Sequence, residues 1–358
     1  MLPGMMRRSR TVLLTLLLTL GAACSRAAET TPQDPLAAEI ERWSAFLQSE
    51  AAAGKAWAEV KPAAQPELDR ARQSLKDGRR LLALLRLSNV RESLATTAYL
   101  SRRPAGQGKD MVLFEAEWKR MGDELRDRLG APSVSPSVSA LDGMRPAAAR
   151  ALGETALLQI RGYYEASLDY GRNTMPGAGL YYLGNAQAQR ELVELLRTLS
   201  ETSSPGSAPP LRSLRPELDA LEADLLAAYR PPASIDRHGE LIVASSTLKE
   251  ARELDAAGLH YGALLRYLQA ALRVAPLRQP SPMLADSKQD WQARLAVDGV
   301  DHSIGRLFLE IAQDNPDNAP IISADVIPRY LAALQPARSE PPGPDPRVTV
   351  TLVRWPYT

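Results

Sequence analysis

The chain has few of the side chains on which metal sites and covalent catalysis depend. Its 358 residues include one cysteine, Cys24, and three histidines, at positions 238, 260 and 302. No histidine lies in an HExxH motif or another metal-ligand spacing, so we expect no metal site and no cofactor. A disulfide within the chain is excluded, because it needs a second cysteine.

Aromatic residues and excess charge are also scarce. Aromatics make up 5% of the chain, and 43 lysines and arginines balance 42 acidic residues. Alanine, leucine, arginine and glutamate dominate instead, which favours helices over strands and predicts an all-α fold. Balanced charge provides no overall field that would attract nucleic acid, so we expect no nucleic-acid partner.

The N-terminus has the order of a secretory signal peptide. Three arginines, at positions 7, 8 and 10, precede the uncharged segment TVLLTLLLTL at 11–20. That segment is too short for a transmembrane helix, which needs roughly 20 apolar residues. The small residues at 21–23 resemble a cleavage site, so we expect the protein to be exported.

Residues 20–24, LGAAC, resemble the lipobox of bacterial lipoproteins. The resemblance implies a diacylglyceryl group on Cys24, removal of signal peptide 1–23, and anchoring of the mature chain to a membrane. The alternative is an ordinary signal peptide cut near Ala23 or Ala28, which also gives export. If the organism is Gram-negative, Ser25 resembles the pattern of lipoproteins sent to the outer membrane, where the chain would face the periplasm.

Composition divides the mature chain into two helical parts. The segment SSPGSAPP at 203–210 offers nothing to bury and predicts a linker. Near the end, VTVTLVRW at 348–355 predicts a short β-strand, which either closes onto its own domain or adds to a partner's sheet. The expected order is a flexible tether at 24–34, a first helical half at 35–202, the linker, a second helical half at 211–340, and a proline-rich tail with the strand at 341–358.

Apolar periodicity predicts the individual helices. An amphipathic pattern begins near Ile40 and resumes after a proline joint at 62–66. Further helices are expected at about 111–129, 146–170, 179–199, 216–229, 239–256, 258–274, 291–312 and 324–334, with a break at Pro176-Gly177.

An internal repeat links the two halves. The pattern L-x-x-A-R-x5-G-x4-A-L-L-R occurs at 68–86 and again at 248–266, an offset of 180 residues. It predicts a helix that ends near the glycine, Gly78 or Gly258, and a second helix whose alanine lets the two axes approach closely. Each copy is therefore expected to form a helical hairpin.

The second copy resembles a tetratricopeptide repeat. Gly258, Ala263, Tyr267 and Ala270 have the spacing of that family, and Leu183-Gly184 resembles the pair in the first helix of such a repeat. The resemblance implies stacked helical hairpins of the α-solenoid type. The alternative is an irregular helical bundle, because stacked hairpins need neighbours to bury their faces.

Two motifs are compatible with catalysis. Residues 246–249, STLK, match the S-x-x-K motif of penicillin-binding proteins and class A β-lactamases, but the companion S-D-N and K-T-G motifs are absent. The pairs Glu115 with Glu117 and Glu191 with Glu194 offer the two carboxyls that glycan hydrolysis requires. Such pairs are also common on solvated helix faces, which is the simpler interpretation.

Tyrosines gather on two of the predicted helices around the Pro-Gly break. Tyrosine and arginine are favoured at binding hot spots, where a ring supplies area and a polar tip supplies direction. The alternative is that the rings pack the interface between the helices, with a capping role for Asn173. The predicted partner-binding residues are Tyr163, Tyr164, Tyr170, Arg172, Asn173, Tyr181, Tyr182 and Asn185.

Taken together, these features predict a lipid-anchored helical scaffold that binds an envelope protein or peptide. The alternative from another class is an envelope enzyme acting on peptidoglycan or glycans. A substrate-binding lipoprotein is a third reading, but the alternating βαβ pattern usual in such proteins is missing.

Overall fold

The computed structural model describes residues 34–103, 107–129, 141–200, 208–230, 235–277, 290–296 and 299–335. Within these ranges the secondary structure is helical and contains no β-strand, which confirms the all-α class. The signal peptide, Cys24 and the C-terminal strand predicted above lie outside the described residues. Residues 203–207 of the predicted linker also lie outside the described residues.

The helices mostly match their predicted ranges, and α5 matches at both ends. A π-helical turn, Ile322–Val326, joins the last two helices, α13 and α14. The helices are α2 (Pro35–Gln48), α3 (Lys55–Lys76), α4 (Arg80–Ser101), α5 (Met111–Leu129), α6 (Ala147–Asn173), α7 (Pro176–Ser200), α8 (Arg215–Ala228), α9 (His238–Ala256), α10 (His260–Val274), α11 (Trp291–Arg294), α12 (Ser303–Asp314), α13 (Ala319–Ile321) and α14 (Ile327–Ala333).

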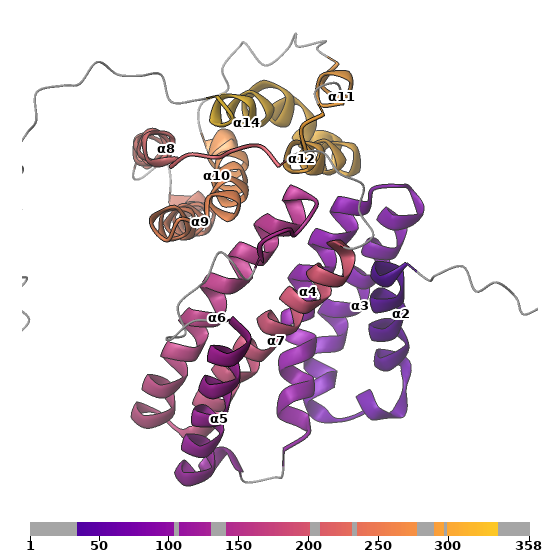
Figure 1. Ribbon diagram of the computed structural model, residues 1–358, viewed down its shortest axis with the longest axis vertical. Coiled ribbons are helices and arrows are strands. Elements are labelled where there is room, and N and C mark those ends of the chain that lie inside the picture. The colour runs from indigo at the N-terminus through magenta and orange to yellow at the C-terminus, as the bar shows by residue number, and fades with distance from the viewer. Residues whose placement is uncertain are drawn as a thin grey trace, which may run out of the picture.

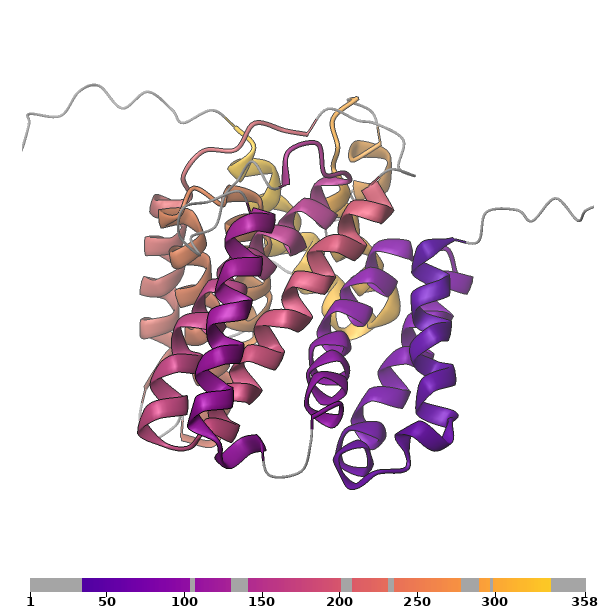
Figure 2. The ribbon, with the colours of Figure 1, turned by 60° about the horizontal axis from the view of Figure 1, so that its bottom comes forward.

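The long hairpin of α6 and α7 is the centre of the fold (Figure 1). Helix α4 packs along α7, α10 packs along α6, and α5 contacts both central helices. Figure 2 shows α2 to α4 on one side of this hairpin and α8 to α10 on the other. The central hairpin therefore separates the two copies of the sequence repeat.

Both repeat copies form the predicted helical hairpins, α3 with α4 and α9 with α10. Gly78 and Gly258 have φ values of 76° and 74°, a left-handed conformation that favours glycine. The residue after each glycine donates its backbone N–H to an equivalent carbonyl of the preceding helix. The bond from residue 79 to residue 74 is 2.8 Å long, and that from residue 259 to residue 254 is 2.9 Å long. The alanines at positions 83 and 263 are fully buried, so each pair of helices packs closely.

The two predicted halves share one cluster of buried residues. Helix α12 packs against α4 and α6, and residues 301 and 303, just before and at its start, supply side chains to the first turn of α6. Asp301 accepts a 2.5 Å hydrogen bond from the N–H of Ala147, and the Ser303 hydroxyl accepts one of 2.9 Å from Ala148. These bonds satisfy N–H groups that have no partner within the helix.

Two predicted helix boundaries were wrong. Pro62 and Pro66 lie inside the continuous helix α3 rather than at a joint. They are four residues apart and both exposed. The carbonyls that lose an N–H donor therefore face solvent, which lowers the free-energy cost of proline inside a helix. The single helix predicted at 291–312 is divided into α11 and α12, with Gly299 between them at a φ of 62°.

Candidate functional site

Four of the predicted tyrosines form a connected group on the central hairpin. The rings of Tyr170 and Tyr182 stack with centroids 4.5 Å apart, and Tyr181 meets Tyr182 edge-on at 5.8 Å. Tyr163 lies 6.2 Å from Tyr182. Because Tyr170 is 44% exposed and Tyr181 is 50% exposed, the group presents aromatic surface to solvent. We call Tyr163, Tyr170, Tyr181 and Tyr182 the tyrosine strip.

Two other predicted residues are buried in helix packing. The Tyr164 ring stacks on Trp118 of α5, with centroids 5.1 Å apart, and its hydroxyl donates to the Trp118 carbonyl. Asn185 accepts a 2.7 Å hydrogen bond from the Thr96 hydroxyl of α4. These contacts place Tyr164 in the packing of α6 against α5 and Asn185 in the packing of α7 against α4.

The remaining predicted residues, Arg172 and Asn173, are exposed near the end of α6. Arg172 forms a 2.9 Å ion pair with Glu115 of α5. The Asn173 amide donates to the Asp169 side chain one turn earlier. Helix α6 continues through Asn173, three residues beyond the predicted end, so this residue belongs to the last helical turn.

The tyrosine strip continues into a groove between the two repeat hairpins. The cavity has a volume of about 230 Å³ and is lined by α4, α6, α7 and α10. Leu85 and Leu265, which are 180 residues apart and equivalent in the repeat, both line it, as do Asn89 and Gln269 at the same offset. The lining residues are Leu85, Ser88, Asn89, Glu92, Leu152, Thr155, Gln159, Tyr163, Gln189, Leu192, Leu265, Arg266 and Gln269. We call this cavity the inter-hairpin groove.

Hydrogen bonds fix one end of the groove and leave other polar groups available. Glu92 accepts a 3.0 Å bond from the Tyr163 hydroxyl and another from the Gln189 amide. Burial and the nearby Glu92 carboxylate raise the pKa of Tyr163, which keeps its hydroxyl protonated as a donor. The amides of Asn89 and Gln159 make no hydrogen bond to any other described residue. The groove can therefore offer donors and acceptors to a polar ligand.

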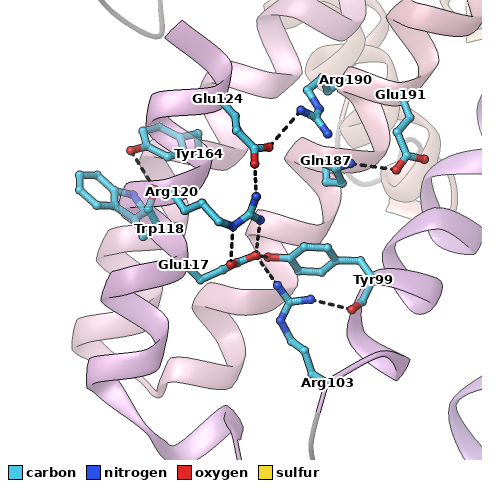
Figure 3. A network of polar contacts seen from close by, with 10 residues as sticks. All are labelled: Tyr99, Arg103, Glu117, Trp118, Arg120, Glu124, Tyr164, Gln187, Arg190 and Glu191. Carbon is cyan, nitrogen blue, oxygen red and sulfur yellow. Dashed lines mark hydrogen bonds and ion pairs between the residues drawn. The ribbon is translucent and has the colours of Figure 1, made fainter. Parts of the chain in front are cut away.

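A second cleft, of about 420 Å³, lies between α2, α4, α5 and α7. Figure 3 shows its central network, in which Glu117 of α5 is the main acceptor. Glu117 accepts from the Tyr99 hydroxyl at 2.7 Å, from Arg120 at 2.8 and 2.7 Å, and from Arg103. Although burial opposes ionisation, these donors lower the pKa of Glu117 to about 2.

The catalytic candidates do not assemble into a site. Ser246 and Lys249 are exposed on α9, and Lys249 pairs with Glu253 at 3.8 Å. Glu117 stays ionised near neutral pH, whereas a general acid for glycan hydrolysis needs a raised pKa. Glu115 is engaged by Arg172, as described above.

The described residues contain no group of three or more histidine, cysteine or acidic side chains placed to hold a metal ion. None of the described helices is both long and apolar enough to cross a membrane. No family model, curated protein or solved structure matches this chain.

Proposed function

We propose that this chain is an exported, lipid-anchored protein of the bacterial cell envelope that binds an envelope protein or peptide. The N-terminal segment, which resembles a lipoprotein signal peptide, supports export and membrane anchoring. The tyrosine strip and the adjoining inter-hairpin groove support the binding role. The chain would act as a helical scaffold, related in its hairpins to tetratricopeptide repeats.

The stacked pair formed by the exposed Tyr170 and the half-buried Tyr182 is the observation that carries this proposal. Tyrosine supplies a large apolar contact at a low cost in side-chain entropy, and its hydroxyl adds direction. Contacts between neighbouring rings pre-organise the strip, which lowers the cost of binding. The amides of Asn89 and Gln159 line the groove and make no hydrogen bond to another described residue, so they match the donors and acceptors of a peptide backbone.

An envelope enzyme acting on peptidoglycan or glycans is less well supported. Ser246 is exposed on α9, Lys249 pairs with Glu253, and the low pKa of Glu117 is unsuited to proton donation. The scaffold proposal requires no such chemistry.

Site-directed crosslinking tests the proposal in the intact chain. A photoreactive residue is placed at position 181, crosslinked in living cells, and the adduct is identified after detergent solubilisation. We expect one specific envelope protein, and we expect Tyr170→Ser to remove the adduct. Tyr229, which is 47% exposed directly after α8, is the matched control, and Tyr229→Ser should leave the adduct unchanged. An adduct that survives Tyr170→Ser, or no protein adduct from position 181, would overturn the proposal.

A further inference from the structure

We infer that the cleft between α2, α4, α5 and α7 is an anion site that takes a phosphate group. This inference does not depend on the proposed binding of a protein partner, because the cleft and the tyrosine strip share no residue. Five arginines and three glutamates line the cleft, which leaves two more cations than carboxylates. Arg91 and Glu39 behind it add one charge of each sign and leave the surplus unchanged.

Each carboxylate lining the cleft already accepts hydrogen bonds from at least two side chains. Glu117 accepts from three residues, as described above, and Glu124 accepts from Arg120 and Arg190. Glu191 accepts from Gln187 at 2.9 Å and from Arg91 at 3.3 Å. No carboxylate lining the cleft is therefore free to neutralise the surplus positive charge.

Glu39 and Glu191 balance Arg42 and Arg91, so the surplus lies on Arg102 and on the three arginines that share Glu117 and Glu124, which are Arg103, Arg120 and Arg190. Arg42 pairs at 2.7 Å with Glu39, which does not line the cleft. Arg102, at the end of α4, is exposed and forms no ion pair with any described residue. Within a concave site, fixed charges of one sign concentrate the field and attract a counter-ion. The geometry therefore leaves the Arg102 guanidinium available to an incoming anion, beside arginines that share their carboxylates.

Phosphate fits this cleft by charge and by hydrogen bonding. A phosphate monoester carries about −1.5 to −2 charges at neutral pH, which matches the surplus of two cations. Guanidinium groups donate in pairs to phosphate oxygens, and arginines at the end of α4 and on α5 and α7 line the cleft. Arg103 and Arg190 have only 17% and 13% of their side chains exposed, so low local dielectric would strengthen the attraction. The phosphate could belong to a free solute or to a lipid headgroup.

Calorimetric titration of the full chain in detergent tests the site with two probes. Inorganic phosphate represents the free solute, and water-soluble dihexanoyl phosphatidic acid represents the headgroup. We expect saturable binding that weakens as sodium chloride is added. Binding of inorganic phosphate supports a free-solute site, and binding of the phosphatidic acid alone supports a headgroup site. Failure of the native chain to bind either probe would overturn the inference.

Arg102→Glu is the diagnostic variant, because it reverses the charge of an arginine that forms no ion pair with any described residue. We expect it to weaken binding about tenfold or more, since one attraction becomes a repulsion. Arg161→Glu is the matched control, since Arg161 is exposed on α6 outside the cleft. Arg102→Ala provides a second test if Arg102→Glu does not fold, as judged by circular dichroism. Equal affinity in the native chain and a folded cleft variant would contradict the assignment.

Discussion

The carboxylate of Glu154 on α6 accepts a 2.8 Å hydrogen bond from the backbone N–H of Gly262, in the first turn of α10. The equivalent position in the other repeat is Leu82, and its N–H donates at 2.7 Å to Glu310 of α12. Both second helices of the repeat hairpins are thus capped by a glutamate from another helix. The caps satisfy orphan N–H groups and attach each hairpin to its neighbour.

Removing either cap should destabilise the fold. Glu154→Ala and Glu310→Ala each leave a helix N–H without its acceptor, which we expect to cost about 1–3 kcal/mol of unfolding free energy. Urea denaturation followed by circular dichroism measures the change. Glu165→Ala, which removes an exposed pair on α6, should stay within about 0.5 kcal/mol of the native chain. A cap variant as stable as that control would show that the bond contributes nothing.

The turn glycines of the two repeats should respond alike to substitution. Gly78→Ala and Gly258→Ala place a β-carbon in a left-handed conformation, at an expected cost of about 1–2 kcal/mol each. Gly162 is the control, because it is exposed within α6 with open space around its Cα. Gly162→Ala should stabilise the chain by about 0.5–1 kcal/mol in thermal or urea unfolding. If all three substitutions changed the unfolding free energy in the same direction, the proposed role of the turn conformation would be contradicted.

The repeat made the hairpins predictable, because the spacing of glycine and alanine is a local property of the sequence. The course of α3 was less predictable, since the tolerance of Pro62 and Pro66 depends on which face of the helix meets solvent. A similar limit applies to the tyrosines. Adjacent residues such as Tyr163 and Tyr164 point in different directions on a helix, but the sequence does not indicate which one faces the core.

The two clefts could not be predicted, because each combines side chains from four helices. Arg120 and Glu124 lie four residues apart, which in the sequence is typical of an ordinary solvated helix pair. Only the packing of α5 beside α4 and α7 turns this pair into part of a shared network (Figure 3). One sequence feature did point to the groove. Leu85 of α4 and Leu265 of α10 are 180 residues apart, the offset of the internal repeat, and both line it.

Glu117 should make stability depend on pH in the acid range. Its pKa falls from 4.5 to about 2 on folding, so its contribution is complete above pH 4.5 and is lost as the pH falls toward 2. We therefore expect Glu117→Gln to cost about 1–2 kcal/mol at pH 7, after allowance for solvent screening, and nearly nothing at pH 2. Urea unfolding of both proteins across this range measures the difference. A difference that does not vary with pH would contradict the assignment of the shift to this carboxylate.

Cys24→Ala should release the protein from the membrane. The variant lacks the thiol that would carry the diacylglyceryl group, and each buried acyl methylene contributes about 0.8 kcal/mol to anchoring. Fractionation by ultracentrifugation, with a radiolabelled fatty acid to detect the lipid, measures both effects. Ser25→Ala is the control, and it should remain lipidated and membrane-bound. Equal labelling of the Cys24→Ala variant would contradict lipidation at this position.

Tyr164 and Tyr170 lie on the same helix but should give opposite phenotypes. Tyr164 is 6% exposed and stacks on Trp118, so Tyr164→Ala opens a cavity between α5 and α6 and should cost roughly 3 kcal/mol. Tyr170 is 44% exposed, and Tyr170→Ala should change the unfolding free energy by only about 0.5–1 kcal/mol, from its lost ring contact with Tyr182. Urea unfolding separates the two, and partner crosslinking at position 181 should be lost in Tyr170→Ala while the protein stays folded. If instead Tyr170→Ala destabilised the chain as strongly as Tyr164→Ala, the tyrosine strip would belong to the core of the hairpin rather than to a binding surface.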